Sequence, residues 1–247
     1  MANPTNVVSV AILMSLRRTM PRLFILAVAA AMATLLASRA NLIDLPRIYD
    51  PFALPDLDET PHWLTQVQLK LVDANVENCA FAFAKTGLPA TLQPTKGLGT
   101  SCEIERPVTL TKLSRATIRA EDTRCNIAAR LYMWEKHALQ PASQRYFNEP
   151  VVEILHFGSY SCRTIAGSSH MSEHANANAF DISGFRLRSG KVISVLGNWS
   201  TPSMESKFLH VARDSACDYF NLTLSPDYNA AHKDHFHVDM GWVRRCG

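Results

Sequence analysis

The chain has 247 residues, of which 47% are hydrophobic and 19% charged, and its formal net charge at pH 7 is +3. This composition is typical of a globular protein with a substantial core, and it argues against a disordered or fibrous chain. The net charge is too small to indicate nucleic acid as a partner.

Residues 1–40 have the pattern of a targeting segment. Three arginines precede an apolar run at residues 23–38, and Arg39 follows it. Positive charge before an apolar run predicts that the N-terminus stays inside the membrane and that the downstream chain is exported. The run is slightly shorter than the ~20 residues of a straight transmembrane span, so a retained anchor and a cleaved signal peptide both stay open. Of the two, we expect the anchor, because a long stretch precedes the run.

Residues 41–60 contain three prolines and several acidic residues, which predict an extended linker. A single domain is expected over residues 61–247. Within it, helical spacing of apolar residues and capping signals predict three helices. These helices cover residues 61–85 with a break near Asn75, residues 127–138, and residues 204–220 with Ser203 as the N-cap. Residues 86–108 are rich in glycine and proline, which predict a loop.

Four segments rich in β-branched and aromatic residues predict strands of one sheet. They are residues 151–157, 180–187, 192–197 and 235–240. The sequence Arg188-Ser-Gly190 predicts a hairpin turn between the second and the third of them. The expected fold class is therefore α+β, with a small, mainly antiparallel sheet flanked by helices.

Six cysteines lie in the segment that the N-terminal pattern predicts to be exported. An even number of cysteines in an exported chain predicts disulfides. We expect Cys79–Cys102, which would close a loop-rich segment, and Cys217–Cys246, which would tie the tail to the last helix. The remaining pair would be Cys125–Cys162.

Two short stretches carry side chains that suit a divalent metal ion. In the first, His174 and Asp181 are separated by six residues, most of them small, and in the second His237 lies on a predicted strand. Two imidazoles and one carboxylate form a ligand set that leaves a fourth position of a zinc ion open for water. We therefore predict that His174, Asp181 and His237 bind Zn²⁺ on the sheet, and that this zinc is catalytic.

A hydrolytic zinc site also needs a general base and a cation that stabilises the developing oxyanion. His235 is a candidate base because alternation along a strand would place it on the same face as His237. Asp234 is the alternative if this segment is a loop or bulge, and the sequence leaves the choice open. Arg163 follows the end of a predicted strand and is the candidate for the oxyanion, and Asp239 could orient a histidine ring.

Two resemblances extend this interpretation. Ser172, His174, Ala179 and Asp181 match the Ser-x-His-x-x-Gly-x-Ala-x-Asp signature of the D-Ala-D-Ala peptidase and lysostaphin-like zinc metallopeptidases, although Ala177 replaces the glycine. More closely, three further motifs resemble the bacterial extensin-like C-terminal family over roughly residues 50–247. These motifs are Gly158-Ser-Tyr-Ser-Cys-Arg163, Ser225-Pro-Asp-Tyr-Asn229 and Asp234-His-Phe-His237.

The resemblance implies an exported bacterial zinc peptidase that acts on the stem peptides of peptidoglycan. An endopeptidase that cuts next to D-amino acid or diaminoacid residues is expected, serving wall growth or an envelope-spanning machine such as a secretion system. The anchor would then lie in the inner membrane and the domain in the periplasm, or the whole domain would be periplasmic after signal cleavage. Two alternatives stay open, a non-catalytic peptidoglycan-binding protein with a structural zinc and a zinc amidase.

Overall fold

The computed structural model describes residues 4–88 and 91–247. It divides the chain into two compact units, Met1–Ala53 and Leu54–Gly247. The start of the predicted targeting segment, residues 1–3, lies outside the described residues, as do residues 89 and 90 of the predicted loop.

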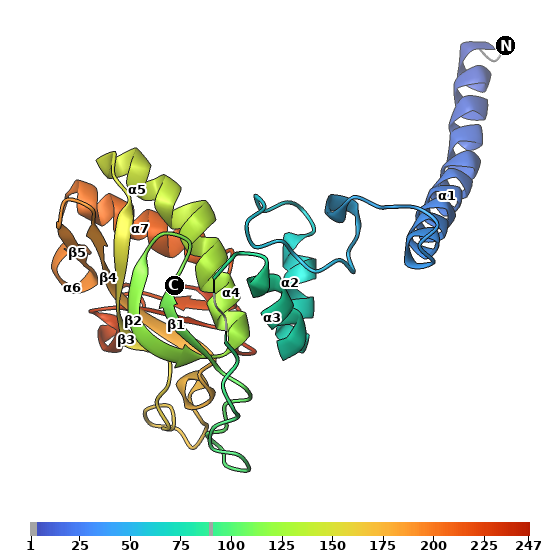
Figure 1. Ribbon diagram of the computed structural model, residues 1–247. Coiled ribbons are helices and arrows are strands. Elements are labelled where there is room, and N and C mark those ends of the chain that lie inside the picture. The colour runs from blue at the N-terminus through green and yellow to red at the C-terminus, as the bar shows by residue number, and fades with distance from the viewer. Residues whose placement is uncertain (1–3, 89–90) are drawn as a thin grey trace. The chain divides into compact units, whose positions relative to one another are not determined.

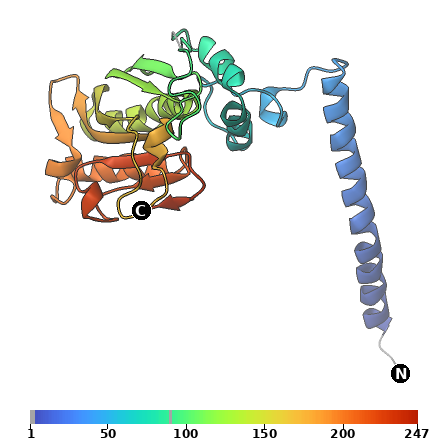
Figure 2. The same cartoon turned by 90° about the horizontal axis from the view of Figure 1, so that it is seen from below.

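The N-terminal unit consists mainly of one long helix, α1 (Pro4–Arg39), followed by the short 3-10 helix η1 (Arg47–Tyr49). Figure 2 shows α1 as one continuous helix, with Pro21 inside it. Its segment Pro21–Arg39 is long and apolar enough to cross a membrane, and none of it is buried. A signal sequence meets the same criteria, so the helix is consistent with either a membrane anchor or a signal.

The C-terminal unit is built around one sheet, which has eight strands in the described residues (Figure 1). The strands are β1 (Val108–Lys112), β2 (Thr117–Thr123), β3 (Val151–Gly158), β4 (Ala179–Leu187), β5 (Val192–Ser194), β6 (Leu222–Leu224), β7 (Phe236–Asp239) and β8 (Arg245–Cys246). Their order is β1-β2-β3-β4-β7-β6-β8, and β5 pairs with β4. All four predicted strands belong to this sheet.

The expectation of a small, mainly antiparallel sheet was wrong, because the sheet is large and mixed. β2 pairs with β3 in parallel, and so does β6 with β8, whereas the other neighbours are antiparallel. The chain between β2 and β3 forms helices that cross over the sheet, which permits parallel pairing. The predicted strand at residues 192–197 ends at Ser194, whose hydroxyl accepts a hydrogen bond from the backbone of Gly197 and starts a short helix.

The helices begin and end largely where capping residues predict. They are α2 (Thr65–Ala74), α3 (Val76–Ala84), α4 (Cys125–Trp134), the π-helix η2 (Glu135–Leu139), α5 (Gln140–Phe147), the 3-10 helix η3 (Glu173–Asn176), α6 (Val195–Asn198), α7 (Met204–Ala216) and the 3-10 helix η4 (Ala230–His232). Asn75 breaks the first predicted helix and caps α3, and Ser203 caps α7, each by accepting backbone hydrogen bonds.

The main core lies between the sheet and the helices α4, α5 and α7, which pack against it in Figure 1. The Trp134 ring of α4 lies 6.2 Å from the Phe185 ring of β4, and Phe185 lies 5.5 Å from Phe208 of α7. Along β4, Phe180 and Ile182 are buried in this core. Because successive side chains of a strand point to opposite faces, Asp181 is directed away from the helices.

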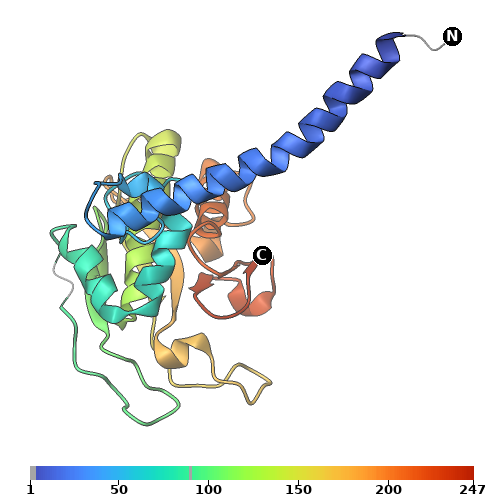
Figure 3. The same ribbon diagram turned by 90° about the vertical axis from the view of Figure 1, so that its right-hand side faces the viewer.

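Three disulfides join all six cysteines, but only one of the predicted pairings was right. Cys217–Cys246 is confirmed, whereas the other bonds are Cys79–Cys125 and Cys102–Cys162. Helix α3 packs against the start of α4, which brings the first pair together across 46 residues. The second bond joins two loops that project from the same side of the domain in Figure 3. Closeness along the chain was therefore a poor guide to pairing.

Candidate metal centre

Strand pairing in the middle of the sheet brings two of the predicted ligands together. β4 and β7 are antiparallel neighbours, and Asp181 is directly opposite His237. Directly opposed residues project from the same face with their side chains in contact range. The Asp181 carboxylate and the His237 ring are each only slightly exposed, at 13% and 12%.

The third predicted ligand, His174, comes from helix η3 just before β4. Ser172 caps this helix by accepting a hydrogen bond from the His174 backbone, and His174 is 3% exposed. At Ala177 the chain takes a left-handed conformation, with φ of 52°, and then enters β4. This turn points the ring of His174 back across the first residues of the strand.

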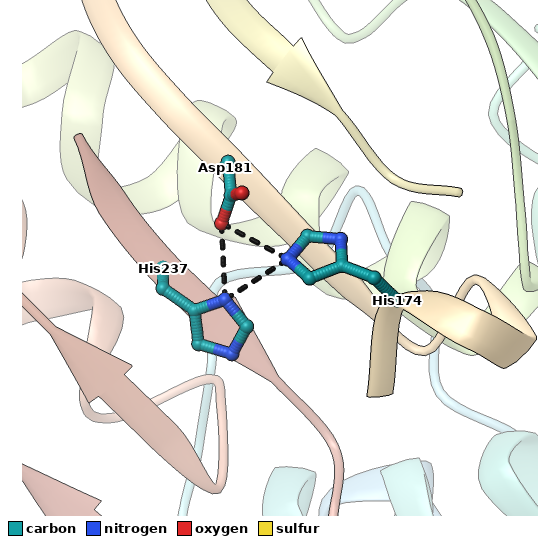
Figure 4. A group of neighbouring side chains, drawn as sticks. All are labelled: His174, Asp181 and His237. Carbon is teal, nitrogen blue, oxygen red and sulfur yellow. Dashed lines mark hydrogen bonds and ion pairs between the residues drawn. The ribbon is translucent and has the colours of Figure 1, made fainter. Parts of the chain in front are cut away.

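The three side chains converge on one point, as Figure 4 shows. His174 Nε2 lies 3.1 Å from His237 Nδ1 and 3.2 Å from Asp181 Oδ1. His237 Nδ1 lies 3.0 Å from the same carboxylate oxygen. The structure thus brings all three predicted ligands together, with one donor atom from each.

The second ring nitrogen of each histidine is held by another group. His174 Nδ1 donates to the backbone carbonyl of Ser159 at 2.8 Å, since that carbonyl can only accept. His237 Nε2 lies 2.9 Å from Asp239 Oδ2, so Asp239 orients the ring as expected. These contacts leave the lone pairs of His174 Nε2 and His237 Nδ1 directed at the point of convergence, as in metal sites where an outer partner fixes the tautomer.

The electrostatics of the cluster favour a shared proton when no metal is bound. Burial alone would raise the pKa of Asp181, but hydrogen bonds with His174 and His237 outweigh it and hold that pKa well below its usual range. Burial disfavours a charged His237, yet its bonds to Asp181 and Asp239 outweigh this effect and raise its pKa to about 9. A cation is therefore stabilised at this position.

The donor set fits a zinc-like divalent cation. Tetrahedral bonds of about 2.0–2.2 Å separate the ligand atoms by about 3.3–3.6 Å. The three atoms here are 3.0–3.2 Å apart, so small side-chain movements suffice. With three protein donors, the fourth position would face the cavity beside them. The identity of the metal stays a prediction.

That cavity, which we call the metal cavity, has a volume of about 540 Å³. Besides the three ligands, it is lined by Arg163, Tyr228, His232 and His235. His235 lies directly before β7. Its Nδ1 contacts Asp234 Oδ1 at 2.8 Å, and its Nε2 faces Asp181 Oδ1 at 3.6 Å.

The predicted base and oxyanion candidates thus differ in how closely the structure ties them to the ligands. Asp234 does not line the cavity in the described residues, and it acts on the cluster only through the His235 ring. Arg163 lines the cavity from an exposed loop, next to the Cys102–Cys162 bond that tethers this loop.

Two contributors were missed by sequence reasoning. Ser159 holds His174 through its carbonyl oxygen, a role that any residue type could fill, so its side chain gave no signal. His232 lines the cavity, with its ring 5.3 Å from that of His235. Burial, followed by the charges of His237 and His235, lowers the pKa of His232 to about 4, which keeps this ring neutral at pH 7.

Fold and site together define a mixed α/β domain with a candidate metal centre on its sheet. Residues 77–247, more than half of the chain, match the family model described as extensin-like protein C-terminus. The chain belongs to this extensin-like family, which confirms that resemblance. No curated protein and no solved structure matches the chain, and the relation to the D-Ala-D-Ala and lysostaphin-like peptidases stays a prediction.

Proposed function

We propose that this protein is a zinc-dependent peptidoglycan peptidase, and more specifically an endopeptidase that cuts wall peptides next to D-amino acid or diaminoacid residues. The observation that supports it most is the convergence of His174 Nε2, His237 Nδ1 and Asp181 Oδ1 beside a cavity that carries further histidines. The match of the His174–Asp181 spacing to the D-Ala-D-Ala and lysostaphin-like signature supplies the reaction class.

A zinc ion bound by these three residues would lower the pKa of a bound water to about 7 and polarise a peptide carbonyl. His235 is the proposed general base. Its Nδ1 is held by Asp234, so its Nε2 is the atom that exchanges the proton on the cavity side. Asp234 is then a positioning residue for this ring. Arg163, on the cavity wall, is proposed to stabilise the oxyanion.

The proposal places the enzyme at the bacterial inner membrane, with residues 41–247 in the periplasm. The apolar helix Pro21–Arg39 and three disulfides support an exported, tethered domain, because disulfides persist in oxidising compartments. A tethered hydrolase suits a polymeric substrate such as the wall. The context would be wall growth or the assembly of an envelope-spanning machine such as a secretion system.

One observation favours a second candidate, a non-catalytic wall-binding protein with a structural zinc. His235 Nε2 lies only 3.6 Å from Asp181 Oδ1. A small movement would let His235 become a fourth protein ligand, and closed four-ligand sites are typical of structural zinc.

Digestion of purified peptidoglycan, followed by mass spectrometry of the soluble products, tests the proposal. An endopeptidase releases fragments with new peptide termini, whereas a zinc amidase separates intact stem peptides from the sugar chain. A binding protein sediments with the wall and releases nothing. The protein stripped of metal and then reloaded with zinc provides the control, since activity must disappear and return.

A further inference from the structure

A second cavity lies on the other side of helix η3. It has a volume of about 760 Å³ and is formed by α2, the start of α4, η3 and the chain around residues 240–244. We call it the arginine cavity. Among the described residues, its cationic lining consists of Lys70, Arg124, Arg130 and Arg244.

Buried guanidinium groups in this cavity have hydrogen-bond donors without acceptors. Arg130 is 3% exposed and forms an ion pair with Asp73 through Nη2, but its Nε and Nη1 have no partner among the described residues. The Nε of Arg124 is buried and unpartnered as well. Buried donors are nearly always satisfied in native proteins. Unmet donors on two residues that line one cavity therefore indicate an acceptor supplied by a ligand.

The charge balance of the cavity also favours an anion. Its two carboxylates are already engaged, Asp73 with Arg130 and Glu173 with the side-chain amide of Asn178. Burial and, more weakly, the charge of Arg244 lower the pKa of Arg130, although Asp73 opposes both effects. The two guanidinium groups therefore repel each other, and an anion bound between them would relieve this repulsion.

The geometry of the donors points to a carboxylate. The planar guanidinium fork matches the two oxygens of a carboxylate, and such charge-assisted pairs are among the strongest hydrogen bonds in proteins. Asn126 and Asn221 add amide groups to the wall, and Trp242, which is fully exposed, contributes an indole ring at the edge. These groups suit the polar and uncharged parts of an extended ligand.

We propose that the arginine cavity is a second binding site, which takes a carboxylate group of an extended acidic peptide. The inference rests on the proposed function for the identity of that peptide, a wall stem peptide whose residues carry carboxylates outside the main chain. Glu173 lines both cavities, and the next residue is the metal ligand His174. One extended peptide can therefore occupy the two cavities together and be aligned for cleavage.

The test measures binding in a protein that cannot turn over. Asp181→Ala protein is titrated with a soluble stem pentapeptide that has free carboxylates, and with the same peptide after its carboxylates are amidated. Arg244→Ala and Arg130→Lys are added to this background, and Arg188→Ala, an exposed arginine outside both cavities, is the matched control. Arg130→Lys keeps the charge opposite Asp73 but loses the forked donors.

We expect Arg244→Ala and Arg130→Lys each to weaken binding of the free peptide about tenfold, the effect of losing one charge-assisted hydrogen bond. Binding of the amidated peptide should be weak in every variant. The proposal fails if both variants bind the free peptide as tightly as Arg188→Ala does, or if the parent protein does not bind it. Should Arg130→Lys lose its fold by circular dichroism, Arg244→Ala decides alone.

The two proposals can fail separately. If the arginine variants lose binding while wild-type protein releases nothing from peptidoglycan, the second site stands and the peptidase function falls. If peptidoglycan is cut while the arginine variants bind normally, the peptidase function stands and the second site is overturned.

Discussion

The metal cavity and the arginine cavity lie on either side of helix η3, and they differ in how their polar atoms are satisfied. In the metal cavity, both nitrogens of His174 and of His237 have protein partners. In the arginine cavity, buried nitrogens of Arg124 and Arg130 have none. The first site is therefore organised by the protein before any ligand arrives, whereas the second is complete only when a ligand supplies acceptors.

Removal of a metal ligand should have the largest effect and should separate the two cavities. His174→Ala or Asp181→Ala leaves two protein donors, so bound zinc should fall below about a tenth of an equivalent and wall turnover by at least about 10³-fold. Metal analysis and peptidoglycan digestion measure these losses. Ser183→Ala, two residues further along β4, is the control. Loss of carboxylate-peptide binding in the same variants would show that the cavities are one site.

Replacement of the proposed base should reduce turnover and leave the metal in place. His235→Ala removes the ring whose Nε2 faces Asp181, and the loss of a general base costs about 10²–10⁴-fold in rate. Asp234→Ala should cost less, because it only frees the orientation of that ring. Exposed Lys233→Ala is the neighbouring control. Loss of zinc in His235→Ala would instead identify His235 as a fourth ligand and favour the structural-zinc alternative.

The metal cavity was largely predictable because its residues follow local rules. Two-residue alternation along β4 and β7 places Asp181 and His237 on one face, and the buried apolar residues around them fix which face that is. The break at Asn75 and the cap at Ser203 were predictable for the same reason, since each depends on a side chain and the backbone next to it.

The arginine cavity was not predictable, because its parts meet only in the folded chain. Lys70, Arg130 and Arg244 come from α2, α4 and the C-terminal segment, and nothing in the local sequence of any of them indicates a shared cavity. The disulfide partners and the parallel pairing of β2 with β3 depend on long-range packing in the same way. Fold class and ligands therefore emerged from the sequence more readily than pairings across the domain.

The pH dependence of metal uptake should distinguish the pre-organised cavity quantitatively. In the metal-free protein the pKa of His237 is raised to about 9, so the ring is charged at pH 7. A metal ion binds the neutral ring and must release this proton. The apparent zinc affinity should therefore rise about tenfold per pH unit up to about pH 9 and then level off. Competition with a chromogenic chelator measures it. An affinity independent of pH between 6 and 8 would contradict this assignment.

The same proton links pH to the stability of the metal-free fold. Since the pKa of His237 in the folded state exceeds the ordinary value, its contribution to stability is fully present below about pH 6.5. That contribution is lost as the pH rises toward about 9. The thermal midpoint of the metal-free protein should accordingly decrease over this range, and bound zinc should remove the dependence.

Ala177 gives the smallest effect, and it tests whether the backbone between the cavities is strained. This residue has φ of 52°, and it occupies the position where the peptidase signature has glycine. Its amide donates to the His174 carbonyl on one side, and its carbonyl accepts from the Arg124 amide on the other. A left-handed conformation costs a non-glycine residue about 1–2 kcal/mol, and part of this is offset by the greater chain entropy that glycine loses on folding.

Ala177→Gly should therefore stabilise the protein by about 0.5–1 kcal/mol and raise its melting temperature by about 1–4 °C. Zinc content and carboxylate binding should both stay unchanged, because the backbone hydrogen bonds of residue 177 are retained. Ala175→Gly is the matched control, since Ala175 lies within η3 and should lose about 1 kcal/mol or more. If Ala177→Gly were as destabilising as this control, the buried methyl group would outweigh the strain. The alanine would then be the better residue for holding the two cavities in register.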